Sequence, residues 1–254
     1  MSLRTVAATR YVTPLREGGS LPAIVEGDDD GLYVLKFRGA GQGPRALVAE
    51  VIAGELARAV GLQVPEIVLV ELDADMARTE PDPEIQALIR ASAGTNVGLD
   101  YLPGSVMFDP VAEKPDAGLA SAIVWFDAYV TNIDRTARNV NLLTWHRALW
   151  LIDHGAALYF HHAEGDYRAR IGDRFPQVKQ HVLLPFATAI GAADASMPRS
   201  LTPATIRSAV DAVPHAWLDG GLPREAYVDY LTRRLEAPRG FAEEAQRACD
   251  ALHV

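Results

Sequence analysis

The sequence has a single cysteine, Cys249, among its 254 residues. One thiol excludes an internal disulfide and fits a reducing compartment such as the cytosol. The sequence also lacks an apolar run of the roughly 20 residues that a membrane-spanning helix needs. Residues 1–10 contain no continuous apolar segment and no small-residue cleavage pattern, so we expect no export signal and a cytoplasmic protein.

Positive charge is scarce as well, since 24 Lys and Arg stand against 33 Asp and Glu and give a formal net charge of −9 at pH 7. Repulsion from phosphate groups argues against broad nucleic-acid binding and against attraction to anionic membranes, and we expect no membrane insertion. With 49% hydrophobic and 22% charged residues, the composition is typical of a globular protein. A chain of this length buries most of its apolar surface as one large domain or two modest lobes.

The most informative stretch, residues 125–155, combines three polar side chains with two short apolar runs. Asn139 leads into the first run, and residues 148–152 form a second run that ends at Asp153. The two runs predict an antiparallel hairpin, which would bring Asn139 beside Asp153 because the open ends of antiparallel strands meet. Asp134 lies one short loop upstream of the hairpin.

Amide and carboxylate oxygens suit a hard divalent ion such as Mg²⁺, which keeps several waters and takes further ligands from substrate phosphates. We therefore expect Asn139 and Asp153 to be metal ligands. The carboxylate of Asp134 would accept the proton of an attacking hydroxyl or orient that hydroxyl. Taken one at a time, these residues are more typical of turns, where Asp and Asn are favoured. Their combined spacing is what predicts a catalytic site.

The run DRTARN at 134–139, followed by IDHG at 152–155, resembles the catalytic and metal-binding loops of HipA-like kinases and, more distantly, of phosphoinositide kinases. Both families place Asn five positions after the catalytic Asp and a metal-binding Asp after the next strand. This chain has Thr136 where those families usually carry His, and His154 where Phe is commoner. The resemblance spans most of the chain and implies an α+β, two-lobed protein-kinase-like fold that uses ATP and Mg²⁺.

The strand expected at residues 32–37 is hydrophobic except for Lys36. Its ammonium would pair with nucleotide phosphates, as the strand lysine of kinases does, although a lysine on a solvated strand face is also common. The helix predicted at residues 45–60 carries Glu50 and Glu55 on different sides. The resemblance favours Glu50 as the partner of Lys36, and a solvated helix face is an equal alternative for it.

Two further segments are candidates for contact with ATP. A glycine-containing turn can face a phosphate with its backbone N–H groups, and an ordinary β-turn explains the same residues equally well. The strand within residues 94–104 resembles the interlobe hinge of HipA-like kinases, whose backbone meets the adenine edge, although any edge strand offers such groups. The candidate contacts are Gly18, Gly19 and Ser20 in the turn and Asp100, Tyr101 and Leu102 in the hinge. The glycine-rich segment 38–44 either covers a ligand or merely links two elements.

The order of these parts predicts a β-rich nucleotide-binding lobe over residues 1–98 and a mainly helical catalytic lobe over residues 99–254. In the second lobe, helices are expected at 119–130, at 178–190, after an N-cap at Thr202, at 224–235 and at 241–253.

These features predict an ATP- and Mg²⁺-dependent kinase that phosphorylates an alcohol group, with protein Ser or Thr as the first choice of acceptor. Asp134, Lys36 and Glu50 would be its catalytic residues. Two alternatives stay open, because Thr136 and the short glycine turn also fit a nucleotide- or partner-binding module with weak or no catalysis, and because the same fold can transfer AMP. No residue identifies the acceptor, which is a protein or a small molecule.

Overall fold

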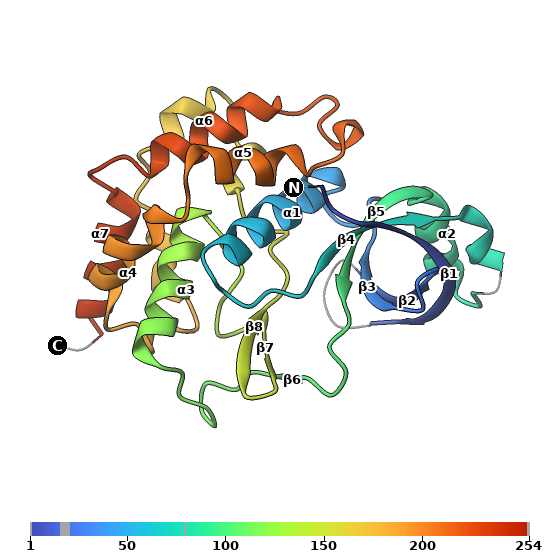
Figure 1. The fold of residues 1–254 in the computed structure, drawn as a ribbon, viewed down its shortest axis with the longest axis horizontal. Coiled ribbons are helices and arrows are strands. Elements are labelled where there is room, and N and C mark those ends of the chain that lie inside the picture. The colour runs from blue at the N-terminus through green and yellow to red at the C-terminus, as the bar shows by residue number, and fades with distance from the viewer. Residues whose placement is uncertain (1, 16–20, 79, 253–254) are drawn as a thin grey trace.

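A computed structural model describes residues 2–15, 21–78 and 80–252. The predicted phosphate-binding turn, Gly18, Gly19 and Ser20, lies outside the described residues. The first part of the chain forms a closed five-stranded barrel with the strand order β1-β2-β3-β5-β4 (Figure 1). Its strands are β1 (Thr5–Pro14), β2 (Ala23–Gly27), β3 (Leu32–Lys36), β4 (Ile67–Leu72) and β5 (Gly94–Asp100). Neighbouring strands are antiparallel except for β1 and β4, which are parallel.

The barrel has an apolar interior because buried and partly exposed side chains alternate along β2 and β3. Helix α2 (Pro83–Ala91) closes one end of this interior with Ile85 and Ile89. In β5, Gly98 allows close strand packing, since a Cβ atom there would lie 2.6 Å from Val70 of β4. The interior of the barrel is therefore a packed core.

Helix α1 (Pro44–Ala59) joins the barrel to the helical part of the chain (Figure 1). Pro44 occupies its first turn, where a missing N–H group is tolerated, and Gly61 follows its end with a φ of 84°. Most of its residues are buried, including Glu50, because α1 packs against the barrel strands on one side and α5 on another. A helix buried all round holds its polar side chains in fixed positions.

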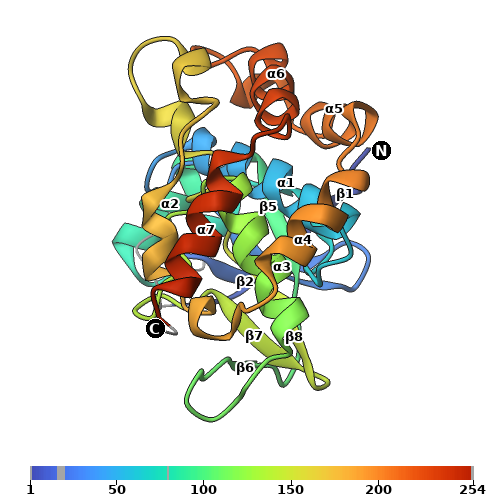
Figure 2. The ribbon, with the colours of Figure 1, turned by 90° about the vertical axis from the view of Figure 1, so that its left-hand side faces the viewer.

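The helical part surrounds α3, which carries Trp125 and Tyr129 in stacked contact with each other. Figure 2 shows α3, α4 and α7 on the near side of the barrel strands, with α5 and α6 beside them. The α-helices are α3 (Ala117–Tyr129), α4 (Ile190–Ser196), α5 (Pro203–Asp211), α6 (Arg224–Arg234) and α7 (Gly240–Asp250). Short 3₁₀ turns are η1 (Ala74–Arg78), η2 (Tyr159–His162), η3 (Tyr167–Arg170), η4 (Pro176–Gln180), η5 (Leu184–Phe186), η6 (Met197–Arg199) and η7 (His215–Trp217). No helix in the described ranges is long and apolar enough to cross a membrane.

The predicted hairpin is present as β7 (Leu142–Trp145) and β8 (Ala148–Leu151), with β6 (Val106–Met107) alongside β7. Its two-residue turn, His146 and Arg147, has φ values of 48° and 65°. Positive φ at both turn positions matches the right-handed twist of the strands, so the turn fixes the pairing register.

The helix predicted at residues 178–190 is wrong. The chain instead forms the separate turns η4 and η5, and α4 begins only at Ile190. Pro185 lies in the middle of the predicted helix, where it lacks an N–H donor and its ring clashes with the preceding turn. The N-cap predicted at Thr202 is confirmed, since its side chain accepts the N–H of Thr205 at 3.1 Å.

Candidate functional site

A cavity of about 830 Å³ lies between the barrel and the helical part. This volume falls in the usual range for sites that bind small molecules and cofactors. Both parts of the chain form its walls, and nearly all the predicted site residues in the described ranges line it. Its polar lining includes Lys36, Gln42, Asp100, Tyr101, Ser105, Asp134, Asn139, Asn141 and Asp153.

Lys36 connects three separate elements at this cavity. Its Nζ atom lies 2.6 Å from Oε2 of Glu50 on α1 and 2.6 Å from Oδ1 of Asp153, which follows β8. The Lys36 side chain is 12% exposed and Glu50 is fully buried, whereas Asp153 remains 44% exposed. The buried Glu50 therefore holds the Lys36 ammonium in place, and Lys36 and Asp153 both line the cavity.

Burial and ion pairing act in opposite directions on the pKa values of Glu50 and Lys36. Burial alone would raise the pKa of Glu50, but the Lys36 ammonium and the nearby His154 ring together outweigh burial and lower that pKa to about 2. Burial would likewise lower the pKa of Lys36, and the carboxylates of Asp153 and Glu50 outweigh it and raise the pKa. Both groups are consequently charged at neutral pH.

The depressed pKa of Glu50 predicts a loss of stability in acid. The folded-state pKa of Glu50 is about 2, against an ordinary value of 4.5 for Glu. The Glu50 charge therefore contributes about 3 kcal/mol to the free energy of unfolding, which is present above pH 4.5 and lost as the pH falls toward 2. We expect Glu50→Gln to be less stable than wild type at pH 7, with the difference narrowing through this window. Urea unfolding at stepped pH values measures it.

Glu55 on the same helix provides a matched control, because burial raises its pKa instead of lowering it. For Glu55→Gln, the stability difference from wild type should therefore not narrow as the pH falls from 4.5 toward 2. A stability difference between Glu50→Gln and wild type that stays constant from pH 7 to the lowest pH at which both fold would contradict the charge assignment of Glu50.

Asp134 lies on the loop after α3 and receives two amide donors. Asn139 Nδ2 donates to Asp134 Oδ2 at 2.6 Å, and Asn141 Nδ2 lies 3.4 Å from the same oxygen. Partial burial and the nearby charge of Asp153 outweigh these hydrogen bonds and raise the pKa of Asp134. A raised pKa makes this carboxylate a better proton acceptor than an ordinary exposed Asp.

Asn141 is a site residue that the sequence analysis missed. Its side chain is buried, its φ is 49°, and it lines the cavity between Asp134 and Ile152. The backbone O of Asn141 accepts the N–H of Ile152 at 3.1 Å, so the hairpin brings Asn141 to the base of the loop that carries Asp153.

The glycine-rich segment 38–44, whose role the sequence left open, contributes Ala40, Gly41 and Gln42 to the cavity wall. The predicted hinge also reaches the cavity through Asp100, Tyr101 and Leu102. Gly41 and Gly43 have φ values of 51° and 67°, which non-glycine residues rarely adopt, so this segment needs its glycines to turn into α1.

The donor set at the cavity fits a hard divalent ion. Asp153, which has a φ of 56°, contacts Lys36 through Oδ1, so its other carboxylate oxygen takes no part in that contact. Asn139 contacts Asp134 through Nδ2, so its amide oxygen takes no part in that contact either. Across the described part of the chain, no three His, Cys, Asp or Glu side chains converge, which is the arrangement that a metal held entirely by the protein would need. Two protein oxygens, waters and phosphate oxygens are the usual ligands of Mg²⁺.

A buried ion pair fixes the loop that carries Asp134. Arg135 Nε lies 2.6 Å from Asp127 Oδ2 with both side chains fully buried, and His181 Nε2 lies 2.9 Å from the same oxygen. Arg135 Nη1 also donates to the backbone O of Asn141 and, at 3.2 Å, to that of Ile152. One guanidinium therefore joins the loop that carries Asp134 to the two residues that flank the open end of the hairpin.

Arg135→Met is expected to lower the free energy of unfolding by about 3–5 kcal/mol, because it leaves the Asp127 charge buried without its main partner. Urea denaturation measures this loss. Arg207→Met is the matched control, since the Arg207–Glu225 pair is exposed and such pairs contribute at most about 1 kcal/mol. Equal losses in the two variants would contradict the role given to Arg135.

A strand lysine that pairs with a helix glutamate and with Asp153, at a cavity that Asp134 and Asn139 also line, is typical of a kinase-like protein of the α+β class. The chain belongs to the HipA-like kinase family, whose model matches residues 9–229. No curated protein matches it significantly.

Two solved kinase structures share the fold. The proinflammatory kinase CtkA of Helicobacter pylori has a TM-score of 0.54 and 14% identity, with 98% of this chain and 99% of that chain covered. The Golgi casein kinase with Mn and ADP bound has a TM-score of 0.54 and 12% identity, with 100% of this chain and 74% of that chain covered. Identities this low establish similarity of fold.

Proposed function

We propose that the chain is an ATP- and Mg²⁺-dependent phosphotransferase that acts on a hydroxyl group of protein Ser or Thr. The observation that carries the proposal is the position of Lys36 Nζ, 2.6 Å from both Glu50 and Asp153, at a cavity that Asp134 and Asn139 also line. The bound Mn and ADP of the Golgi casein kinase support a nucleotide with a divalent metal.

Each residue of the site has a proposed role. Lys36, oriented by Glu50, pairs with the nucleotide phosphates, and the backbone of Asp100, Tyr101 and Leu102 holds the adenine. Asn139 and Asp153 would hold Mg²⁺, which offsets phosphate charge when bound. We also propose that residues 1–98 and 99–254 act as two lobes around the nucleotide.

Asp134 would act on the acceptor. The hydroxyl oxygen of the acceptor bonds to the γ-phosphorus while the bond to ADP breaks, and the carboxylate of Asp134 orients the hydroxyl and receives its proton. The hydrogen bond from Asn139 holds the carboxylate at the edge of the cavity. Most of the catalytic effect then comes from positioning and charge stabilisation.

The geometry of Thr136 favours an active enzyme over a silent binding module. Thr136 Oγ1 lies 3.3 Å from the backbone N atoms of Arg138 and Asn139 and accepts both N–H groups, and its own N–H bonds to the carbonyl of Asn139 at 2.9 Å. These contacts hold the catalytic loop in a compact turn without a His at this position. The departure from the family pattern therefore leaves Asp134 and Asn139 in hydrogen-bond contact.

Intact-protein mass spectrometry after incubation with ATP, Mg²⁺ and a lysate-derived protein fraction tests the proposal. A gain of one or more phosphoryl groups, on the chain itself or on another protein, supports it. A gain in mass of an AMP group would replace it with AMP transfer. No covalent change, together with ATP-induced thermal stabilisation, would leave a binding module.

A further inference from the structure

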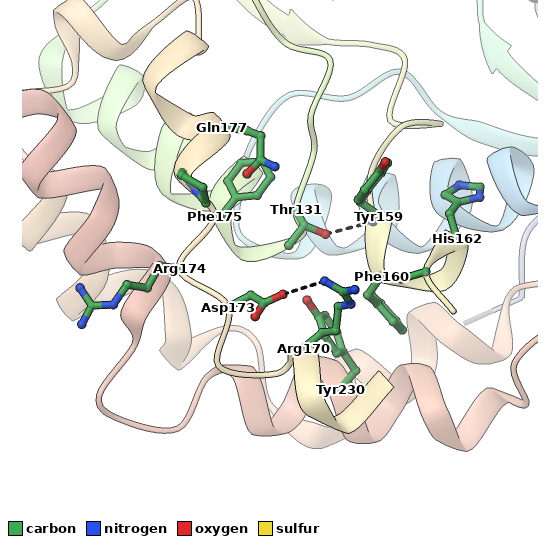
Figure 3. Close-up of a pocket in the computed structure, with 12 residues that line it drawn as sticks. Thr131, Tyr159, Phe160, His162, Arg170, Asp173, Arg174, Phe175, Gln177 and Tyr230 are labelled. Carbon is green, nitrogen blue, oxygen red and sulfur yellow. Dashed lines mark hydrogen bonds and ion pairs between the residues drawn. The ribbon is translucent and has the colours of Figure 1, made fainter. Parts of the chain in front are cut away.

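A second cavity, of about 410 Å³, lies on the segment that follows Gly155 (Figure 3). Residues 156–186 lead from the metal-binding loop toward α4 and form most of its wall. It shares no lining residue with the first cavity, as far as the described residues show. Its lining includes Thr131, Tyr159, Phe160, His162, Arg170, Asp173, Phe175, Gln177 and Tyr230.

The floor of this second cavity is aromatic. Phe160 stacks on Tyr230 of α6, with ring centroids 3.7 Å apart and an angle of 18° between the rings. Phe160, Phe175 and Tyr230 are all buried, so the floor is held in place by the core beneath it. With 1–6% of their surface exposed, these rings shape the cavity and offer a ligand little contact area of their own.

Three residues around the second cavity have a left-handed backbone although none is glycine. Thr131, Leu158 and Phe175 have φ values of 53°, 54° and 60°. Hydrogen bonds hold this geometry, since the N–H of Leu158 donates to Val130 O at 2.7 Å and that of Tyr159 to Thr131 Oγ1 at 3.0 Å. Such strain clusters at binding sites, where the surrounding structure maintains it.

The second cavity is close to the proposed catalytic carboxylate along the chain. Thr131, on its wall, precedes Asp134 by three residues, and three residues span at most about 11 Å. A polypeptide with one side chain in the cavity can therefore present a hydroxyl a few residues away to Asp134.

Arg170 places a positive charge at the second cavity. Residues 167–174 contain three Arg and one acidic residue in a chain whose net charge is −9. Figure 3 shows the Arg170 guanidinium between Asp173 and the Phe160–Tyr230 floor, whereas Arg174 extends away from the cavity. Asp173 lies 3.6 Å from Arg170 with both side chains half exposed, and in the described part of the chain the Arg170 guanidinium donates no hydrogen bond. Its ion pair with Asp173 is made through Nη1, so its remaining N–H groups can take a second carboxylate.

We propose that this second cavity docks the phosphoryl acceptor, a polypeptide that places an acidic side chain on Arg170. The inference rests on the proposed phosphotransfer and adds where the protein acceptor docks and which side chain the enzyme recognises on it. The acidic net charge of the chain argues against a nucleic acid in the same place.

A positional-scanning library of Ser- and Thr-containing peptides, incubated with Mg²⁺ and ATP, tests the proposal. Wild type should prefer Asp or Glu at one position relative to the acceptor. Arg170→Glu should lower phosphorylation of the acidic peptides about tenfold or more and create a preference for Lys or Arg at that position. Arg78→Glu, which reverses a similar exposed Arg on η1, should keep the wild-type profile.

A new preference for basic residues distinguishes altered docking from a general defect, because a poorly folded variant gains no specificity. Wild-type phosphorylation without an acidic preference, or an unchanged profile in Arg170→Glu, would overturn the docking proposal alone. Phosphoryl transfer to other acceptors but to no peptide would also overturn it and leave the phosphotransferase in place. Absence of any transfer would remove the proposed function and this inference with it.

Discussion

Asp134→Asn is expected to slow phosphoryl transfer by about 100- to 10,000-fold while Mg²⁺-ATP continues to stabilise the protein against heat. The amide has nearly the same size as the carboxylate but cannot receive the acceptor proton. In the structure, partial burial raises the pKa of Asp134, which makes it suited to this transfer. Release of ADP in the presence of an acceptor measures the rate, and a thermal melt with and without ATP measures binding.

Asp219→Asn is the matched control for Asp134→Asn, because Asp219 is exposed and lies outside both cavities. It should keep the wild-type rate. An Asp134→Asn protein that releases ADP as fast as wild type would show that another group positions the acceptor. A variant that also loses its ATP-induced stabilisation would place Asp134 in nucleotide binding instead.

Asp153→Asn should lower turnover by about 100- to 1,000-fold and raise the Mg²⁺ concentration needed for the remaining activity. The change removes the negative charge that faces the cavity, while Lys36 keeps its contact with the buried Glu50. Because Glu50 still holds the lysine, this variant separates the metal-binding role of Asp153 from the fixing of Lys36. A Mg²⁺ titration of ADP release provides both quantities.

The outcome that would contradict the assignment of Asp153 is an unchanged Mg²⁺ requirement with lower turnover at every concentration. Asp153 would then act only as a partner of Lys36. Asp100→Asn is an informative comparison, since Asp100 lines the same cavity at the proposed hinge and carries no proposed metal contact. Its Mg²⁺ requirement should equal that of wild type.

Local sequence patterns were sufficient for the elements that build the first cavity. The hydrophobic run around Lys36, the helical spacing of residues 45–60 and the two apolar runs before Asp153 each reflect a short-range rule. The structure contains the corresponding strand, helix and hairpin. Local patterns could not predict the pairing of Lys36 with Glu50, because it joins residues on separate elements. The resemblance to HipA-like kinases selected Glu50, and periodicity alone did not.

Other features depend on contacts that no local pattern encodes. Asn141 reaches the cavity because of the exact register of β7 and β8, and its amide could not be told from an ordinary strand residue. The chain after Gly155 looked helical from its apolar spacing, yet Pro176 and Pro185 divide it into short turns. The second cavity combines Thr131, Phe160 and Tyr230 from distant parts of the chain. Such a site becomes visible only when tertiary packing is known.

The central claim is that Lys36, Asn139 and Asp153 converge on one metal-bound triphosphate, with Asp134 next to its terminal phosphate. A crystal structure with Mg²⁺ and a non-hydrolysable ATP analogue tests it most directly. We expect the triphosphate in the larger cavity, within hydrogen-bond reach of Lys36, and a metal about 2.1 Å from oxygens of Asp153 and Asn139. A nucleotide bound elsewhere, or a metal with no contact to Asp153, would contradict the account.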